Sequence, residues 1–393
     1  MRAGWEIKRL GEVCEIIKGR KPVLKSIPSE GDFRYLVAKV LRGSKEAEYA
    51  SVHDRNSIQV NESEIIIICD GSNSGEIFIG YQGILSSTMG KIVKKAAIND
   101  AYLRAFLDST FDVFNSAKTG SAIPHLDKEG LYALKFPFPP FSEQQRIVAL
   151  LDEAFAAIAT AKANAEKNLN NARALFDSYL NSVFSRRGDG WVENKLVSLT
   201  TKIGSGATPR GGGESYKTEG TSLIRSLNVH DPGFRYSKLA FLDDGQADGL
   251  SNVIVQPGDV LLNITGASVA RCCIVPDDVL PARVNQHVSI IRPISSKLDS
   301  DFLHYLLISK YYKDQLLQTG AEGGATRQAI TKAQIQDFTV GYPAERGEQQ
   351  SIVSKLDALR KETQHLESIY QKKIEALDVL KKSILHQAFN GEL

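Results

Sequence analysis

The chain has 393 residues, of which 24% are charged and 42% hydrophobic, and its formal net charge is +2 at pH 7. This composition is ordinary for a globular chain with two or three domains, and it excludes low-complexity disorder, collagen and a small disulfide scaffold. The small net charge also excludes a histone-like polycation, so any binding charge must be sought locally.

Cysteine use and the apolar runs bear on the cellular compartment. The four cysteines include no CxxC pair and no second pair with the spacing of zinc ligands, and we expect Cys272 and Cys273 to be buried, reduced thiols in a strand. The first residues show no apolar stretch after the positive charge, and the run from Ile65 to Cys69 is far too short for a membrane span. We therefore expect a cytoplasmic protein with no signal peptide and no membrane partner.

The most informative feature of the sequence is an internal repeat. The segment 5–10 (Trp-x-x-x-Arg-Leu) recurs at 191–196 as Trp-x-x-x-Lys-Leu, a shift of 186 residues. The segment 143–152 (Glu-Gln-Gln-x-Ile-Val-x-x-Leu-Asp) recurs at 348–357, a shift of 205 residues that stays constant to the end of each copy. A constant register indicates one continuous helix there, whereas the growing shift before it places insertions in a globular part.

The first part of each copy is rich in glycine, proline and short apolar runs. The run 65–68, four isoleucines, is followed by an Asp-Gly dipeptide, and the run 260–262, Val-Leu-Leu, by a Thr-Gly dipeptide. Apolar runs of this length between turn signals predict buried strands. We therefore predict a mixed globular domain in each copy.

The second part of each copy has the apolar spacing of a coiled coil, alternating four and three residues. The predicted seam of the first helix is Ile147, Leu151, Ala154, Ile158, Ala161, Ala165, Asn168, Ala172, Leu175 and Tyr179. The predicted seam of the second helix is Ile352, Leu356, Leu359, Thr363, Leu366, Tyr370, Lys373, Leu377, Leu380 and Ile384. Ser142 is the expected N-cap of the first helix, and Gly188 and Gly391 are expected as left-handed residues past the two helix ends.

Each helix of about forty residues would span roughly 60 Å and would expose its apolar seam if it stood alone. We therefore expect the two helices to pair antiparallel, with polar seam positions that leave room for a partner helix. The predicted fold class is α+β, with two mixed α/β globular domains, residues 1–141 and 187–346. They are joined by two long antiparallel coiled-coil helices, residues 142–186 and 347–393, in a pseudo-two-fold internal repeat.

Motifs that carry catalytic chemistry are missing from the sequence. It contains no GxxxxGK[ST] phosphate loop, no HExxH zinc helix, no GxSxG elbow and no zinc-deaminase signature. The seven histidines are scattered, no Pro-Asp is followed by Glu-x-Lys, and the segment 138–141 (Phe-Pro-Pro-Phe) lacks the polar first residue of an amino-methyltransferase motif. These absences together disfavour a stand-alone enzyme, a resident cofactor and a metal.

Positive charge is concentrated in one segment of each copy. Eight basic residues stand against two acidic ones in the segment 18–45, and six stand against three in the segment 202–238. Glycine and proline interrupt both segments and predict loops, which suit phosphate contact and base reading. The candidate DNA-binding residues are Lys18, Arg20, Lys21, Lys39, Arg42, Lys45, Thr208, Arg210, Arg225, Asn228, Arg235, Arg327 and Gln328.

This layout resembles the specificity (S) subunit of type I restriction–modification systems over essentially the whole chain. The matching segments are 5–13 (Trp-Glu-Ile-Lys-Arg-Leu-Gly-Glu-Val), 139–145 (Pro-Pro-x-x-Glu-Gln-Gln), 206–209 (Gly-x-Thr-Pro), 257–262 (Pro-Gly-Asp-Val-Leu-Leu), 285–287 (Asn-Gln-His) and 387–393 (Gln-Ala-Phe-Asn-Gly-Glu-Leu). The first domain departs from the pattern, because Lys21-Pro22 stands where the second has Thr208-Pro209, and Ser-Thr-Met stands where the second has Asn-Gln-His.

The resemblance implies a sequence-specific subunit that reads a bipartite, asymmetric site in double-stranded DNA, one half with each target-recognition domain. It implies that the helices set the spacing and dock two modification (methyltransferase) subunits, which restriction (translocase/endonuclease) subunits join. It also implies that S-adenosylmethionine, ATP and Mg belong to those partners and that this chain is not an enzyme. Because the basic loops of the two domains share almost no residues, we predict that the domains read different sequences.

Two other interpretations stay open at this point. A coiled-coil adaptor whose globular domains bind protein partners would share the helices, but its binding would lack the steep salt dependence of contacts to several phosphates. A recognition half separated from a larger modification enzyme would share the domains, and the stoichiometry of the purified complex would distinguish it.

Overall fold

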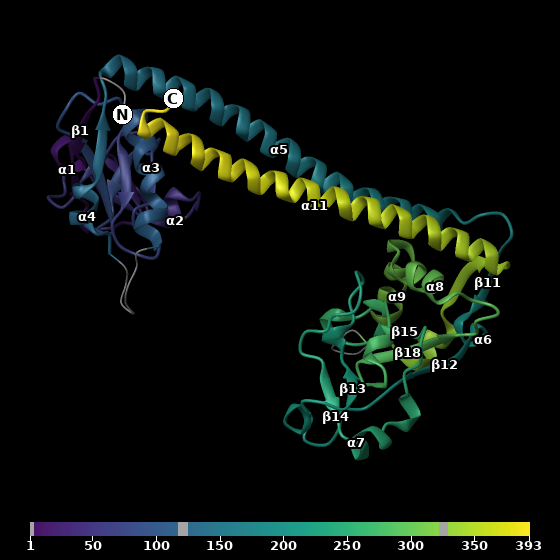
Figure 1. Cartoon of the computed structure of the whole chain (residues 1–393). Coiled ribbons are helices and arrows are strands. Elements are labelled where there is room, and N and C mark those ends of the chain that lie inside the picture. Colours follow the sequence, from purple (N-terminus) through teal and green to yellow (C-terminus); the bar gives the residue numbers. More distant parts are fainter. Residues whose placement is uncertain (1–3, 117–124, 322–328) are drawn as a thin grey trace. The chain divides into compact units, whose positions relative to one another are not determined.

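The computed structural model describes residues 4–116, 125–321 and 329–393, in two compact units (Figure 1). Unit 1 comprises Met1–Ala165 and Lys372–Leu393, and unit 2 comprises Glu166–Gln371. Each unit therefore contains one globular domain and a segment of each of two long helices. Among the described residues, no helix is both long enough and apolar enough to cross a membrane.

The domain of unit 1 contains two four-stranded sheets and a two-stranded ribbon. One sheet is antiparallel throughout, in the order β2 (Cys14–Lys18), β9 (Met89–Lys94), β6 (Ile65–Ile68), β7 (Ile77–Phe78). The other has the order β4 (Tyr49–Ser51), β3 (Asp32–Leu36), β8 (Gly83–Leu85), β5 (Gln59–Val60), with β3 and β8 parallel. The ribbon pairs β1 (Glu6–Arg9) with β10 (Lys135–Phe138), and the domain helices are α1 (Leu10–Val13), α2 (Ala38–Leu41), α3 (Asp100–Ser116) and α4 (Lys128–Ala133).

The domain of unit 2 repeats this plan. Its antiparallel sheet has the order β12 (Thr200–Ser205), β18 (Val288–Pro293), β15 (Val260–Asn263), β16 (Cys272–Ile274). Its second sheet has the order β14 (Ala240–Leu242), β13 (Thr221–Ile224), β17 (Ala282–Val284), with β13 and β17 parallel. The ribbon pairs β11 (Trp191–Lys195) with β19 (Thr339–Pro343), and the domain helices are α6 (Leu196–Leu199), α7 (Asp244–Asp248), α8 (Ser300–Ile308), α9 (Lys310–Ala321) and α10 (Lys332–Asp337).

The sequence repeat is therefore a structural repeat. In each domain a ribbon strand and a one-turn helix lead into the first strand of the antiparallel sheet, and the other ribbon strand leads into a long helix. The second sheet contains one parallel pair in both domains. The expected α+β class with two mixed domains is confirmed, and the predicted strands 65–68 and 260–262 lie in β6 and β15.

The central strands are apolar throughout because both of their faces are covered. All four isoleucines of β6 are buried, and alternate members face two different apolar clusters. β15 behaves in the same way, with Val260 and Leu262 in one cluster and Leu261 in another. A strand buried on both faces reads as a continuous apolar run, which is the pattern that these segments show.

The two long helices are α5 (Phe141–Arg186) and α11 (Arg346–Asn390). Their segments run antiparallel in both units. A cation of α11 lies over an aromatic ring of α5 in each unit, namely Lys381 over Phe155 and Arg360 over Phe176. Ion pairs also join the helices, namely Lys162 with Asp378 (2.7 Å) in unit 1 and Arg173 with Glu367 (3.0 Å) in unit 2. In each unit the contacts that come later along α5 come earlier along α11.

The repeated Glu-Gln-Gln sequence has a structural explanation in its middle residue, which is buried in both copies. The side-chain carbonyl of Gln144 accepts from the backbone N–H of Asn99 (2.9 Å), and its amide donates to a carbonyl of the proline pair before the helix (2.9 Å). Gln349 accepts from the N–H of Asp299 (2.8 Å) and donates to the carbonyl of Pro343 (2.9 Å). Each glutamine thus fastens the start of a long helix to its own domain.

The predicted seam of α5 is correct as far as Ala165; beyond it Ala172 is buried as predicted, but the other predicted positions are exposed and a neighbouring residue is buried or partly buried in their place. Leu169 is buried whereas Asn168 is exposed, and Phe176 packs inward whereas Leu175 is exposed. An α-helix turns once in 3.6 residues, so a contact face drifts away from a strict 3.5-residue repeat unless the pair supercoils fully. The inward face therefore moves to the next residue over the length of the helix.

The predicted seam of α11 is wrong at three positions, which alternate with positions that are correct. Thr363 is buried as expected, and Leu377 is partly buried. Leu366, Lys373 and Leu380 are exposed instead.

The helix ends differ from the predicted caps in two places. α5 begins at Phe141, so Ser142 lies inside the first turn and is not its N-cap. The left-handed residue after α5 is Arg187 (φ 54°), not Gly188, whereas Gly391 (φ 75°) follows α11 as predicted.

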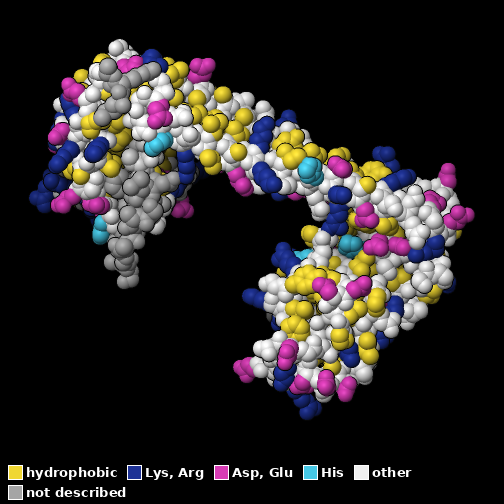
Figure 2. Space-filling model, viewed as in Figure 1, with side chains coloured by type: hydrophobic (Ala, Val, Ile, Leu, Met, Phe, Trp, Pro, Cys, Tyr) yellow, Lys and Arg dark blue, Asp and Glu magenta, His cyan; other side chains and the backbone are white. Residues whose placement is uncertain are grey.

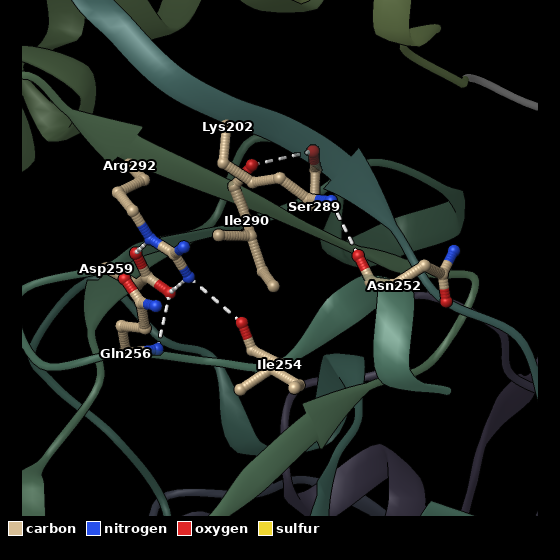
Figure 3. A network of polar contacts seen from close by, with 8 residues as sticks. All are labelled: Lys202, Asn252, Ile254, Gln256, Asp259, Ser289, Ile290 and Arg292. Atoms are coloured by element: carbon tan, nitrogen blue, oxygen red, sulfur yellow. Dashed lines mark hydrogen bonds and ion pairs between the residues drawn. The ribbon is translucent and has the colours of Figure 1, made fainter. Parts of the chain in front are cut away.

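A buried ion pair fixes the start of β15 in unit 2 (Figure 3). The Asp259 side chain is fully buried, and its two oxygens accept from Nε and Nη2 of Arg292 at 2.7 and 2.8 Å. Asp259 also accepts from the N–H of Gln256 (2.7 Å), and Arg292 donates to the carbonyl of Ile254 (2.9 Å). The Pro-Gly-Asp turn is thereby tied to the neighbouring strand β18 by two charge-assisted bonds.

Candidate nucleic-acid interface

In each domain three loops meet at one edge of the antiparallel sheet. β12 and β15 both run antiparallel to β18 between them, so the ends of β12 and β15 and the start of β18 share an edge. The ends of β2 and β6 and the start of β9 share an edge in the same way. We call this the loop edge. It comprises residues 19–22, 69–71 and 86–88 in unit 1 and residues 206–210, 264–268 and 285–287 in unit 2.

One glycine in each domain allows two of these loops to touch. A Cβ on Gly206 would lie 1.8 Å from the carbonyl oxygen of Val284, and a Cβ on Gly19 would lie 2.2 Å from that of Ser86. The N–H of Gly206 also donates to the carbonyl of Asn285 (3.1 Å). Because no side chain fits at these points, glycine is required for the close approach of the two backbones. The two domains use the same clamp.

A chain of hydrogen bonds joins the three loops of unit 2. The Thr208 hydroxyl donates to Oε1 of Gln286. Nε2 of Gln286 lies 3.2 Å from Nε2 of His287, and Nδ1 of His287 lies 2.6 Å from the hydroxyl of Thr265. Because an amide nitrogen only donates, Nε2 of His287 accepts, so the ring carries its proton on Nδ1 and donates to Thr265. The series of hydrogen bonds therefore runs in one direction and holds the loops in one arrangement.

Gln286 is the exposed member of this chain. An amide has two N–H donors and two lone pairs on its oxygen, and the contacts above use one of each. The remaining donor and acceptor lie side by side on one rigid group. This is the pair that matches N7 and N6 of adenine in the major groove.

Next to the hydrogen-bonded chain lies an open cavity of about 720 Å³. Thr265 and His287 belong to its wall, together with His230, Arg235 and Arg271. None of the described residues that line it is Asp or Glu. A basic and polar hollow of this kind suits a phosphate or the edge of a base.

The loop edge of unit 1 carries different side chains on the same framework. Asp70 accepts from Lys18 (2.6 Å) and from His125 (2.8 Å). Burial alone would raise the pKa of Asp70, but the hydrogen bonds from Lys18 and His125 hold it below its usual value. The hydroxyls of Ser86 and Thr88 lie 2.9 Å apart on the next loop. The donors and acceptors of the two domains therefore differ at equivalent places.

Several basic residues predicted for DNA contact in unit 1 lie in ion pairs. The pairs are Lys18 with Asp70 (2.6 Å), Lys39 with Glu46 (3.7 Å) and Arg42 with Glu76. These acidic partners lie outside the segment 18–45, so the local charge count overstated the positive potential. Arg20 and Lys21 are exposed on the loop edge itself, and Lys45 is exposed after α2.

Two residues predicted for DNA contact in unit 2 make contacts within their own domain, and the prediction is wrong for Asn228, which is fully buried. Asn228 is fully buried, accepts from the N–H of Arg225 (3.1 Å) and donates to the carbonyl of Arg235 (2.8 Å). Arg225 is partly buried, donates to the carbonyl of Lys238 and lies over the ring of Tyr216. These side chains shape the loop from within.

The other predictions for unit 2 lie at or near the loop edge. Thr208 belongs to the hydrogen-bonded chain, Arg210 is exposed on the same loop, and Arg235 lines the cavity. Arg327 and Gln328 lie outside the described residues.

The sequence analysis did not select Thr265, Gln286, His287 or Arg271 as contact residues. The signal for Thr265, Gln286 and His287 was positional: polar residues just after β15 or just before β18 lie at one edge once the three strands are antiparallel. A charge count misses Thr265 and Gln286 because they are uncharged, and Arg271, directly before β16, lies outside the basic segment 202–238.

Figure 2 shows dark-blue Lys and Arg side chains mixed with magenta Asp and Glu side chains on the visible face of each unit. The positive charge therefore does not form one broad patch on that face. In the part of the chain that the structure describes, no three His, Cys, Asp or Glu side chains are grouped to hold a metal ion. All four cysteines are buried, and burial raises the pKa of Cys14 to about 11.

Two similar domains, each with a clamped loop edge and each followed by a long helix, define a duplicated recognition protein. A family model described as the type I restriction modification DNA specificity domain matches residues 2–170 and again residues 191–376. The chain belongs to this family. It is a sequence-recognition subunit of a type I restriction–modification system and not an enzyme.

Curated relatives are similar over most of their length. The specificity subunit of the type I restriction enzyme MjaVIII from Methanocaldococcus jannaschii is 28% identical and is covered over 93% of its length by 99% of this chain. The EcoBI specificity subunit from Escherichia coli is 22% identical, with 79% of its length and 91% of this chain covered.

Solved structures share the fold. The HsdS subunit from Thermoanaerobacter tengcongensis has a TM-score of 0.62 at 21% identity, with 100% of this chain and 98% of that chain covered. A chain from a structure that describes assembly and conformational transition of the type I R-M system has a TM-score of 0.77 at 20% identity, with 100% and 99% covered.

Proposed function

We propose that the chain reads a bipartite, asymmetric DNA site, with the loop edge of unit 1 on one half and that of unit 2 on the other. The observation that supports this most strongly is the pair of loop edges. One glycine-clamped framework carries Lys18 and Asp70 in unit 1 but Gln286 and His287 in unit 2. Two different sets of donors and acceptors suit two different base sequences.

The test is to express the chain with a methyltransferase subunit and to sequence the methylated adenines of the host genome. Gln286→Ala should relax one half of the methylated site and leave the other half unchanged. Arg20→Ala combined with Lys21→Ala should affect only the other half, since each domain reads separately. Lys310→Ala, which removes an exposed cation of α9 paired with Asp314 (2.7 Å), is the control. If both loop variants altered the same half, or neither altered any, the assignment would fail.

The salt dependence of DNA binding separates this proposal from a protein-binding adaptor. A reader that contacts several phosphates should lose about a thousandfold or more in affinity for its site between 50 and 200 mM salt. An adaptor whose domains bind proteins would show no such slope for duplex DNA.

We also propose that the long helices dock two modification subunits, which restriction subunits join in the cytoplasm. S-adenosylmethionine, ATP and Mg are then bound by these partner subunits. Leu175 of unit 2 and Leu380 of unit 1 are 51% and 47% exposed, and the 205-residue shift relates their positions. Large apolar side chains exposed at equivalent positions suit two copies of one partner.

Stepwise loss of partners would test this docking. Leu175→Glu or Leu380→Glu alone should leave one copurified methyltransferase subunit per chain, and the double variant should leave none. Val23→Glu alters a still more exposed apolar residue (73%) that is not part of the long helices, and it should leave both partners bound. Loss of both partners from a single helix variant would contradict two separate docking places.

A further inference from the structure

The contacts between α5 and α11 have the same register in both units. In the ion pairs Lys162–Asp378 of unit 1 and Arg173–Glu367 of unit 2, the two residue numbers add to the same total. The cation–ring contacts Lys381–Phe155 and Arg360–Phe176 also share one total. The two halves of the helix pair are therefore equivalent under the repeat.

The two ion pairs occupy equivalent places, but their charges are exchanged. The shift of 205 residues takes Lys162 of α5 to Glu367 of α11, and it takes Arg173 of α5 to Asp378 of α11. At equivalent positions, therefore, α5 carries two cations and α11 carries two anions. Each ion pair joins one helix to the other, at 2.7 Å in unit 1 and 3.0 Å in unit 2.

A second copy of the chain offers the same helices in the same register. If α5 paired with α5 of a second copy, Lys162 of each chain would face Arg173 of the other. If α11 paired with α11, Glu367 of each chain would face Asp378 of the other. Either like-with-like pair would thus replace two attractive contacts by two repulsive ones.

The apolar contacts at the helix ends do not make this distinction. Phe184 of α5 packs against Phe302 with ring centroids 5.3 Å apart, and Phe389 of α11 packs against Tyr102 at the same distance. The 205-residue shift relates Phe184 to Phe389, and it likewise relates the buried Leu180 and Leu385. Since either domain receives the same residue types from the end of either helix, the packing at the helix ends would accept a like-with-like pair.

We propose that the two ion pairs are a pairing code that makes α5 accept α11 and reject a second α5, and makes α11 reject a second α11. An exposed ion pair changes a pairing equilibrium by about twofold, and a like-charge contact does so by a similar factor in the other direction. We call an α5–α11 pair a mixed pair. Four contacts change sign when two mixed pairs become one α5–α5 pair and one α11–α11 pair, so the code favours mixed pairs by about 250-fold. On the proposed function, this keeps two different reading domains together.

The full chain, cut once after folding, allows the test. A protease site inserted between Gly188 and Asp189 lies in the exposed linker between α5 and β11. After cutting, the helix contacts hold the two halves together. Isotope-labelled and unlabelled cut protein are mixed, and the mixture is kept in mild urea until labelled and unlabelled halves have fully exchanged. Native mass spectrometry then counts mixed and like-with-like pairs.

The decisive variant is K162E combined with D378K. In the mixed pair of this variant both ion pairs remain, one of them with its two charges exchanged. At the same positions an α5–α5 pair and an α11–α11 pair now also place opposite charges together. We expect like-with-like pairs to make up only about 6% of the cut wild-type chain after full exchange, and to become far more frequent in the cut double variant. The fourfold variant K162E/R173E/E367K/D378K reverses every charge and should restore mixed pairs, which makes it the matched control.

Salt gives a second measurement, because the screening length falls to about 3 Å at 1 M salt. The cut wild-type chain should then form many more like-with-like pairs than at low salt. A random mixture of the wild type at low salt, or a double variant that contains no more like-with-like pairs than the wild type after full exchange, would overturn the proposal. No DNA or partner subunit enters the assay, so its failure is separate from failure of the proposed function.

Discussion

Replacing Gly206 by alanine tests whether the loop edge of unit 2 reads DNA. The new Cβ would stand 1.8 Å from the carbonyl oxygen of Val284, a backbone atom of β17 that is held in a parallel pair. The loop 206–210 must therefore lift, which breaks the bond from Gly206 to Asn285 (3.1 Å) and draws Thr208 away from Gln286. We expect overpacking to lower the free energy of unfolding by about 2 kcal/mol. The loss of support for Gln286 should weaken site-specific DNA binding about tenfold.

Urea unfolding measures the stability, and fluorescence anisotropy with a duplex of the methylated sequence measures the affinity. Gly19→Ala is the matched variant of unit 1, because its Cβ would lie 2.2 Å from the carbonyl oxygen of Ser86. Gly213→Ala is the control, since no atom lies within 4 Å of its Cβ. Duplexes altered in one half-site at a time show which half each variant no longer reads. The reasoning is refuted if Gly206→Ala unfolds more easily but binds DNA as tightly as the wild type.

Three further predictions concern stability and use urea unfolding. Burial, aided by Arg360, lowers the pKa of His304 to about 4 from 6.5, so the unfolded chain takes up this proton first and stability is lost as the pH falls from about 6.5 to about 4. His304→Leu should remove about 3 kcal/mol of that loss, and an unchanged pH profile would contradict the reasoning. Gln349→Leu should cost about 2–4 kcal/mol because it leaves the N–H of Asp299 and the carbonyl of Pro343 unbonded, whereas Gln350→Leu on the exposed side should cost little. Arg292→Leu should lower the free energy of unfolding by about 3–5 kcal/mol, because it leaves Asp259 as a buried lone charge, and adding Asp259→Asn should recover part of this loss. Equal losses in the single and the double variant would argue against the ion pair.

The repeat and the type of each main element could be predicted because they rest on local patterns. Four consecutive isoleucines predict a strand covered on both faces, and β6 has that environment. The register of α5 could be predicted fully only as far as Ala165, and beyond it Ala172 alone of the predicted seam is buried. Beyond it, Asn168 and Leu169 offer two continuations of the same spacing, and the partner helix decides which residue faces inward.

The candidate site was harder to predict because its members come from distant segments. A count of charges along the segment 18–45 does not include Asp70, which the fold brings to Lys18 at 2.6 Å. A polar type such as Asn228 suits base reading in a sequence, yet here the backbone around it uses its whole amide. Gln286 gains its role only when three antiparallel strands bring their ends together.

At the loop edge, backbone contacts hold loops together while the side chains differ between the domains, which explains how one fold can serve two DNA sequences. In each domain one contact between loops is made by backbone atoms, from Gly206 to Asn285 (3.1 Å) and from Gly19 to Met89 (2.8 Å). Side chains at the loop tips, including the hydrogen-bonded Thr208, Gln286 and His287 of unit 2, can therefore differ between the domains without changing this backbone contact. The helix pair shows the reverse arrangement, because its apolar ends are interchangeable and its charges are not. The two copies of the repeat can thus differ in the side chains that read bases, whereas the charges of the long helices favour only the pairing of α5 with α11.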